Sequence, residues 1–173
     1  MVWSKLKKRV ELMFADSLRH RVCLSMVIYR KSHDEMFGRG IIMVDKEEIW
    51  DCDTCKYFLR TEQLADEIRQ INNCSDYKIA DKYVDYIEAY READEIVKKE
   101  GAGDQHIFYQ AIKKYVNMNI EEILNSDNVL ILALGIIDRR VGKRRLPRLE
   151  DKYSTHKLLK YMYKLRVYAE KLK

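Results

Sequence analysis

The chain has little of the two residues that interrupt regular secondary structure. Its 173 residues include one proline and six glycines, so helices and strands joined by short connections are expected. Hydrophobic residues make up 47% of the chain, which is ordinary for a globular protein. A chain of this length buries a core without disulfides or metals. We predict a single globular domain over residues 1–173.

Long hydrophobic runs are also missing. The longest, residues 129–137, has nine residues, which is about half of what a membrane-spanning helix needs. The N-terminal sequence MVWSKLKKRV carries cations but no apolar segment of the kind that follows them in a secretory signal. These absences predict a cytoplasmic protein with no membrane partner.

Cysteine is present at four positions, Cys23, Cys52, Cys55 and Cys74. In a reducing compartment these are expected to be free thiols. Cys52 and Cys55 form a CxxC, but zinc needs four ligands and a second such pair is missing. A βαβ context of the thioredoxin type is not visible either. We predict no metal and no cofactor, and a metal or redox role for the CxxC stays open as a lesser alternative.

The spacing of apolar residues predicts an α+β fold. Short β-branched segments predict a three-stranded antiparallel sheet over residues 22–29, 39–44 and 48–50, with a turn at Asp45-Lys46-Glu47. Helical spacing predicts helices over residues 4–18, 54–72, 78–99, 104–116, 120–124, 127–140 and 154–172, with Ser4, Asp104 and Asp127 as capping residues. The expected order is an N-terminal helix, the small sheet, and a mostly helical C-terminal two thirds.

Charge is unevenly distributed along the chain. Residues 1–33 have a net charge of +6, residues 34–104 of −9, and residues 105–173 of +8, within a total of +5. One interpretation is that the basic ends pack beside the acidic middle and partly neutralise it, and charge alone favours this one. The other is a basic face for nucleic acid or another polyanion.

The densest basic stretch follows the apolar run 129–137. Between residues 138 and 148 six cations stand against one acid, and we call these residues the Arg-rich segment. Cations in the last turn of the preceding helix would stabilise its negative end, with Gly142 in a left-handed C′ position and Pro147 preventing further helix. This interpretation explains Arg139 and Arg140 only. As nucleic-acid-binding residues we predict Arg139, Arg140, Lys143, Arg144, Arg145 and Arg148.

Two other functions remain open beside this non-enzymatic binding role, because no familiar nucleic-acid-binding motif is present. A protein-interaction or regulatory module, acting as a dimer or with a partner, is the alternative suggested by the chain's twelve tyrosines. These include Tyr77, Tyr83, Tyr86, Tyr90, Tyr161, Tyr163 and Tyr168. A metal-dependent hydrolase comes third, built on the acids and histidine around the predicted sheet: His33, Asp34, Glu35, Asp45, Glu47, Glu48 and Asp51. No nucleophile elbow or phosphate loop is present, and no catalytic residue can be named.

Several short motifs together resemble a family of small uncharacterised bacterial proteins. They are WSKLKK at residues 3–8, DSL at 16–18, RV at 21–22, and DRRVGKRRL at 138–146. His33-Asp34 and the hairpin at Val44-Asp45 fit the same pattern. The resemblance covers nearly the whole chain. It implies a cytoplasmic bacterial protein and transfers no active site.

Overall fold

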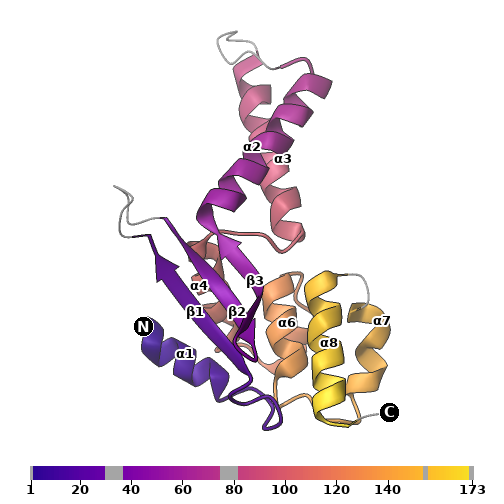
Figure 1. Ribbon diagram of the computed structural model, residues 1–173. Helices are drawn as coiled ribbons and strands as arrows, with labels where there is room; N and C mark the ends of the chain where they lie inside the picture. The colour runs from indigo at the N-terminus through magenta and orange to yellow at the C-terminus, as the bar shows by residue number, and fades with distance from the viewer. Residues whose placement is uncertain (1, 30–36, 75–81, 154–155, 172–173) are drawn as a thin grey trace.

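The computed structural model describes residues 2–29, 37–74, 82–153 and 156–171 (Figure 1). In chain order the elements are α1 (Trp3–Glu11), β1 (Val22–Ile28), β2 (Gly38–Val44), β3 (Glu47–Asp53), α2 (Thr54–Ile71), α3 (Tyr83–Lys99), α4 (Gln105–Tyr115), α5 (Ile120–Leu124), α6 (Val129–Ile137), the 3₁₀ turn η2 (Leu146–Leu149), α7 (Glu150–Tyr153) and α8 (Lys157–Ala169). This order confirms the predicted α+β fold.

The sheet is antiparallel, with strand order β1-β2-β3. Its inner face carries Leu24, Ile42 and Cys52, each with no exposed surface, and packs on α4. Between β2 and β3 the register shifts, so that Ile42 faces Trp50 but Met43 faces Glu48. The extra residue, Ile49, makes a β-bulge. The third strand is longer than the three residues predicted from its sequence.

The turn between β2 and β3 is correctly predicted at Asp45 and Lys46. Both residues have positive φ, 51° and 75°, as the two-residue hairpin turn of type I′ requires. Arg21 at the start of β1 donates to the Asp45 carboxylate with both Nε and Nη2, at 2.9 and 2.7 Å. This ion pair ties the turn to the neighbouring strand.

The helices surround the sheet unequally (Figure 1). α1 lies on the β1 side, α4 packs behind the sheet, and α6 and α8 lie beside β3. All nine residues of α6 are buried, so α6 is the central helix that its apolar sequence predicts. The α2–α3 hairpin extends away from this body, and its two helices pack mainly on each other. No helix in the described ranges is long and apolar enough to cross a membrane.

The first helix ends at Glu11, well before the predicted residue 18, and begins after Val2 without a side-chain cap from Ser4. The reason lies far along the sequence. The backbone of Phe14 pairs with that of Asp138 as an isolated β-bridge, with Arg139 N donating to Met13 O and Ala15 N to Ile137 O, both at 2.8 Å. A backbone used in this bridge cannot continue a helix.

The same bridge corrects the prediction for residues 127–140. α6 spans only Val129–Ile137, and its cap is Asn128 rather than Asp127. Asp138 has extended backbone, with ψ of 132°. The cations at 139 and 140 therefore lie beyond the helix and not in its last turn. Gly142 does not adopt the predicted left-handed conformation, since the one glycine with positive φ in the described ranges is Gly101.

The remaining helix predictions differ mainly at their ends. α2, α4 and α5 match within about two residues. α3 begins at Tyr83, and the predicted start at 78–81 lies outside the described residues, as do 154–155 and 172 of the last predicted helix. α8 begins after His156, whose Nδ1 accepts from Leu158 N at 3.2 Å. The short elements η2 and α7 were not predicted, and Pro147 lies in the first turn of η2.

Gly135 lets α5 pack directly on α6, and this generates a test of the core. A Cβ at this position would lie 2.4 Å from Cγ2 of Ile123, which is fully buried and has no room to move. Gly135→Ala should therefore lower the free energy of unfolding by about 1–3 kcal/mol, measured by urea denaturation. Gly142→Ala is the matched control, because no atom lies within 4 Å of its Cβ position, and should change stability by less than about 0.5 kcal/mol. A Gly135→Ala variant as stable as the wild type would contradict this packing.

Candidate nucleic-acid interface

The Arg-rich segment starts at a buried carboxylate. Asp138 has no exposed surface, and its carboxylate accepts from Tyr115 and from the backbone N, Nε and Nη2 of Arg140. Tyr115 Oη of α4 donates to Oδ2 at 2.6 Å, Arg140 Nη2 to Oδ2 at 2.7 Å, and Arg140 N to Oδ1 at 2.8 Å. Burial, then the charge of Asp138, raises the pKa of Tyr115, so its hydroxyl stays a donor. Arg140 also donates from Nη1 to Met118 O at 3.0 Å. Its guanidinium is thus directed into the protein.

A second arginine, Arg166, binds the backbone of the segment. Arg166 of α8 is only 3% exposed, and burial lowers its pKa. It donates to Asp138 O and to Val141 O, both at 3.1 Å, and its Nε lies 2.6 Å from Glu170 Oε1. The segment is therefore docked on the C-terminal end of α8. Sequence reasoning missed Arg166 among the lysines of that helix, although its i, i+4 spacing to Glu170 was a usable signal.

Two further cations of the segment form ion pairs at the surface. Arg145 Nη2 lies 2.7 Å from Oε2 of Glu121 on α5, and this contact lowers the pKa of Glu121. Lys143 Nζ lies 3.8 Å from Glu170 Oε2. The pair of Arg145 with Glu121 is exposed, and pairs of this kind are weak. The Lys143 contact is long, and its partner Glu170 has a side chain only 6% exposed. The predicted residues Arg140 and Arg145 thus have partners within the protein.

The other three arginines, Arg139, Arg144 and Arg148, are exposed. Within the part of the chain that the structure describes, none of their side chains forms an ion pair or hydrogen bond. Arg139 and Lys143 line a shallow groove of about 300 Å³, together with Ser17 of the loop after α1. Of the six predicted cations, Arg140 and Arg145 thus have close carboxylate partners, and Lys143 has one long contact. Arg139, Arg144 and Arg148 are exposed and have no such partner among the described residues.

The long-range electrostatics favour a basic surface here. Among the ion pairs between described residues, none joins the acidic middle, 34–104, to the basic C-terminal third, 105–173. Those acids of α2 and α3 that form ion pairs do so with cations of the same hairpin, as Asp66 does with Arg69 and Asp94 with Lys98. The positive charge of the C-terminal third is therefore not cancelled by contact with the middle.

The model of the SF0329 protein family matches residues 2–167. The chain belongs to the SF0329 protein family. This is a family of uncharacterised proteins, in agreement with the resemblance visible in the sequence. No curated protein and no solved structure matches the chain.

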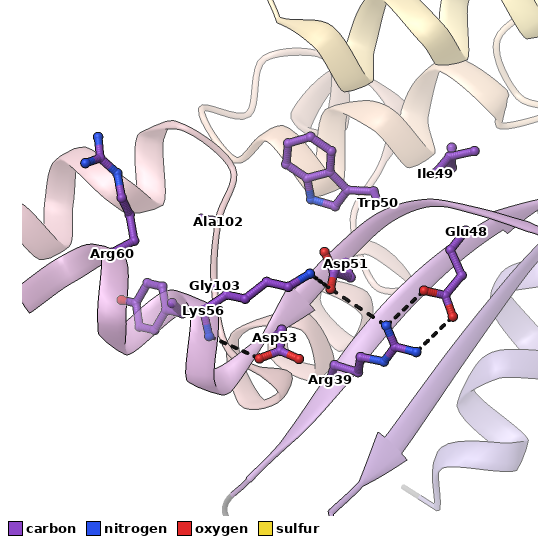
Figure 2. Close-up of a pocket in the computed structure, with 11 residues that line it drawn as sticks. Arg39, Glu48, Ile49, Trp50, Asp51, Asp53, Lys56, Arg60, Ala102 and Gly103 are labelled. Carbon is purple, nitrogen blue, oxygen red and sulfur yellow. Dashed lines mark hydrogen bonds and ion pairs between the residues drawn. The ribbon is translucent and has the colours of Figure 1, made fainter. Parts of the chain in front are cut away.

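In this SF0329 family member, the carboxylates around the sheet line a separate pocket of about 490 Å³, between β3, the start of α2 and the Ala102–Gly103 turn (Figure 2). The bulge at Ile49 turns Glu48 to the face that carries Arg39 and Asp51. Arg39 donates to Glu48 through both terminal nitrogens at 2.9 Å, and Lys56 Nζ lies 2.7 Å from Asp51. These carboxylates therefore neutralise neighbouring cations.

The hydrolase alternative needs carboxylates or histidines gathered around a metal. Among the described residues, no group of three His, Cys, Asp or Glu side chains is placed to hold one. His33, Asp34 and Glu35 lie outside the described residues. The geometry gives Asp45, Glu48 and Asp51 a structural role in ion pairs.

Of the tyrosines that suggest a protein-interaction module, some pack against other side chains and others are exposed to solvent. Tyr86 lies under the Arg69 guanidinium, 3.7 Å from its carbon. Tyr83 at the start of α3 is 53% exposed, whereas Tyr161 and Tyr168 of α8 are 42% and 81% exposed. Tyr77 lies outside the described residues. The most exposed ring thus belongs to the helix on which the Arg-rich segment docks.

All four cysteines are free thiols, as predicted, and the two of the CxxC differ in environment. Cys52 is fully buried at the end of β3, and burial raises the pKa of its thiol to about 12. Cys55 is exposed in the first turn of α2.

At about pH 8, iodoacetamide should alkylate Cys55 while Cys52 reacts only after unfolding in denaturant, as mass spectrometry would show. Equal rates in the folded protein would contradict these environments.

Arg139 and Arg140 are neighbours in sequence and both are exposed, but only Arg140 has side-chain partners among the described residues, which permits a paired test. Arg140→Ala leaves the buried carboxylate of Asp138 without its cation and should therefore destabilise the fold. The loss should be limited to about 3 kcal/mol, because Tyr115 still donates to Asp138. Arg139→Ala should cost less than about 0.5 kcal/mol, since its side chain is exposed. Chemical denaturation of both variants decides this. Equal losses would mean that Arg140 does not support Asp138.

Proposed function

We propose that the chain binds nucleic acid, without catalysis, through phosphate contacts from the exposed cations of the Arg-rich segment. The proposal is supported mainly by the exposure of Arg139, Arg144 and Arg148. The segment's other two arginines have carboxylate partners, Asp138 and Glu121, whereas these three have none among the described residues. Arginine presents a planar fork that matches phosphate oxygens.

A polyanion fits this surface better than a single small anion does. The three arginines lie in successive structural units, one directly after Asp138, one in the following turn and one in η2. Lys143 stands between them with only a 3.8 Å contact to Glu170. Charges spread along a docked segment suit a ligand with repeated phosphates, because each contact then releases counterions. In line with the family resemblance, we further propose that the protein acts in the bacterial cytoplasm.

A second candidate function, protein binding, is favoured by the α2–α3 hairpin. This hairpin extends from the body and exposes Leu59, Tyr83 and Val84, at 62%, 53% and 64%. Exposed apolar and aromatic side chains of this kind occur in protein interfaces. Salt separates the two candidates, since a phosphate-binding surface weakens steeply as salt rises.

The test is a titration of fluorescently labelled RNA and DNA oligomers with the protein at several salt concentrations. Four contacts, from Arg139, Lys143, Arg144 and Arg148, give a slope of about −3 in log K against log salt for a single strand. The triple variant Arg139→Ala/Arg144→Ala/Arg148→Ala should keep its fold and lower the magnitude of the slope by about 2. Its far-UV circular dichroism and thermal transition report folding.

A matched variant carries the same loss of charge on another surface. Lys5→Ala/Lys8→Ala/Arg9→Ala removes three exposed cations from α1, which lies on the opposite side of the sheet from α8 (Figure 1). This variant should bind nearly as tightly as the wild type if the Arg-rich segment is the site. Absence of wild-type binding, or an equal loss in both triple variants, would refute a site at the segment.

A further inference from the structure

Helix α8 contains no acidic residue, and its outward face alternates cations with aromatic rings. Leu158, Leu159, Met162 and Arg166 form the buried side. Nearly opposite to them, at spacings of four, three and four residues, lie Lys157, Tyr161, Lys164 and Tyr168. These spacings place the four side chains in one line along the helix, and we call this line the α8 stripe.

Core packing does not account for the rings of the stripe. Tyr168 is 81% exposed and Tyr161 is 42% exposed, and both lysines are exposed as well. On a helix, residues three or four apart have Cβ atoms about 5–6 Å from each other. Each ring is therefore flanked by a lysine, whose ammonium group is within reach of the phosphate of a nucleotide whose base stacks on that ring.

The stripe and the Arg-rich segment belong to elements that contact each other. Arg166 on the buried side of α8 binds the backbone at Asp138 and Val141, and Lys143 approaches Glu170 just after the helix. The nearest hairpin contributes the pair of Arg21 with Asp45, which is neutral as a unit. The Arg-rich segment therefore docks on the buried side of α8, near the C-terminal end of this helix, and the stripe lies on the outward side of the same helix.

We infer that the α8 stripe binds a single-stranded nucleic acid, with bases stacked on Tyr161 and Tyr168 and phosphates on Lys157 and Lys164. The inference rests on the proposed function, since the Arg-rich segment supplies the remaining phosphate contacts. Every base has a face that can stack on an aromatic ring, so this surface accepts many sequences. In a duplex the base faces are covered by their neighbours, and the rings then contribute little.

The experiment compares three polyanions of similar charge: a single strand of about 20 nucleotides, a duplex of about 10 base pairs, and inorganic polyphosphate of about 20 phosphates. Oligo-U and oligo-dT serve as single strands, so that RNA and DNA are tested separately. Labelled oligomers are followed by fluorescence anisotropy, and polyphosphate by competition. The wild type should bind either single strand more tightly than the duplex, and polyphosphate should compete poorly.

The decisive variants change the rings and leave the charges intact. Tyr161→Ala/Tyr168→Ala should weaken single-strand binding about 30-fold and leave duplex binding nearly unchanged. Tyr161→Phe/Tyr168→Phe should retain the binding, because the ring stacks without its hydroxyl, whereas the double leucine variant should lose it. Tyr83→Ala removes a ring of comparable exposure from α3 and should have no effect.

The outcomes separate this inference from the proposed function. If single strand, duplex and polyphosphate bind equally, and the Tyr161→Ala/Tyr168→Ala variant matches the wild type, the stacking surface is refuted and phosphate binding by the arginines stands. If no polyanion binds, both proposals fall. If the leucine variant binds as well as the phenylalanine variant, the rings act as apolar surface, as in a protein interface, and the inference is wrong.

Discussion

The architecture around the proposed site depends on one buried carboxylate. Asp138 accepts from Tyr115 of α4 and from Arg140, and its own carbonyl accepts from Arg166 of α8. Its backbone also bridges to Phe14, which follows α1. Segments from both ends of the chain thus meet at this residue. A charge without exposed surface is costly unless it is paired and hydrogen-bonded, so these partners are needed together.

This constraint divides the work among the basic residues. Arg140 and Arg166 hold the chain in position after α6, Arg140 through its part-buried contact with Asp138 and Arg166 through buried contacts with the backbone. Arg139 and Arg144 project from the backbone that those two residues hold. A docked segment presents its exposed cations in a defined arrangement, which lowers the entropy lost when an anion binds. The engaged arginines therefore serve the proposed site by orienting it.

Sequence patterns predicted elements well where local periodicity decides the structure. The sheet, its turn at Asp45-Lys46 and the helices α2, α4 and α5 follow from spacing and capping residues. The sequence patterns failed where a contact between distant residues decides the structure. The bridge between Phe14 and Asp138 joins residues more than a hundred positions apart, and it ends both α1 and α6 earlier than periodicity predicts. For the same reason a run of cations could not be divided into paired and exposed members: the partner of Arg145 is Glu121, on another helix.

The uneven charge of the sequence becomes an uneven charge in space. Asp85, Glu88 and Glu92 line the surface of α3, on the hairpin that extends from the body, while α8 carries no acid at all. If these two regions packed on each other, ion pairs between them would be expected. The ion pairs that the acids of the hairpin form are instead with cations of the hairpin itself. A polyanion is then repelled from the α3 surface and attracted to α8 and the Arg-rich segment. In the proposed function, the acidic middle of the sequence would thus restrict where a polyanion binds, and it forms no ion pair with the basic C-terminal third among the described residues.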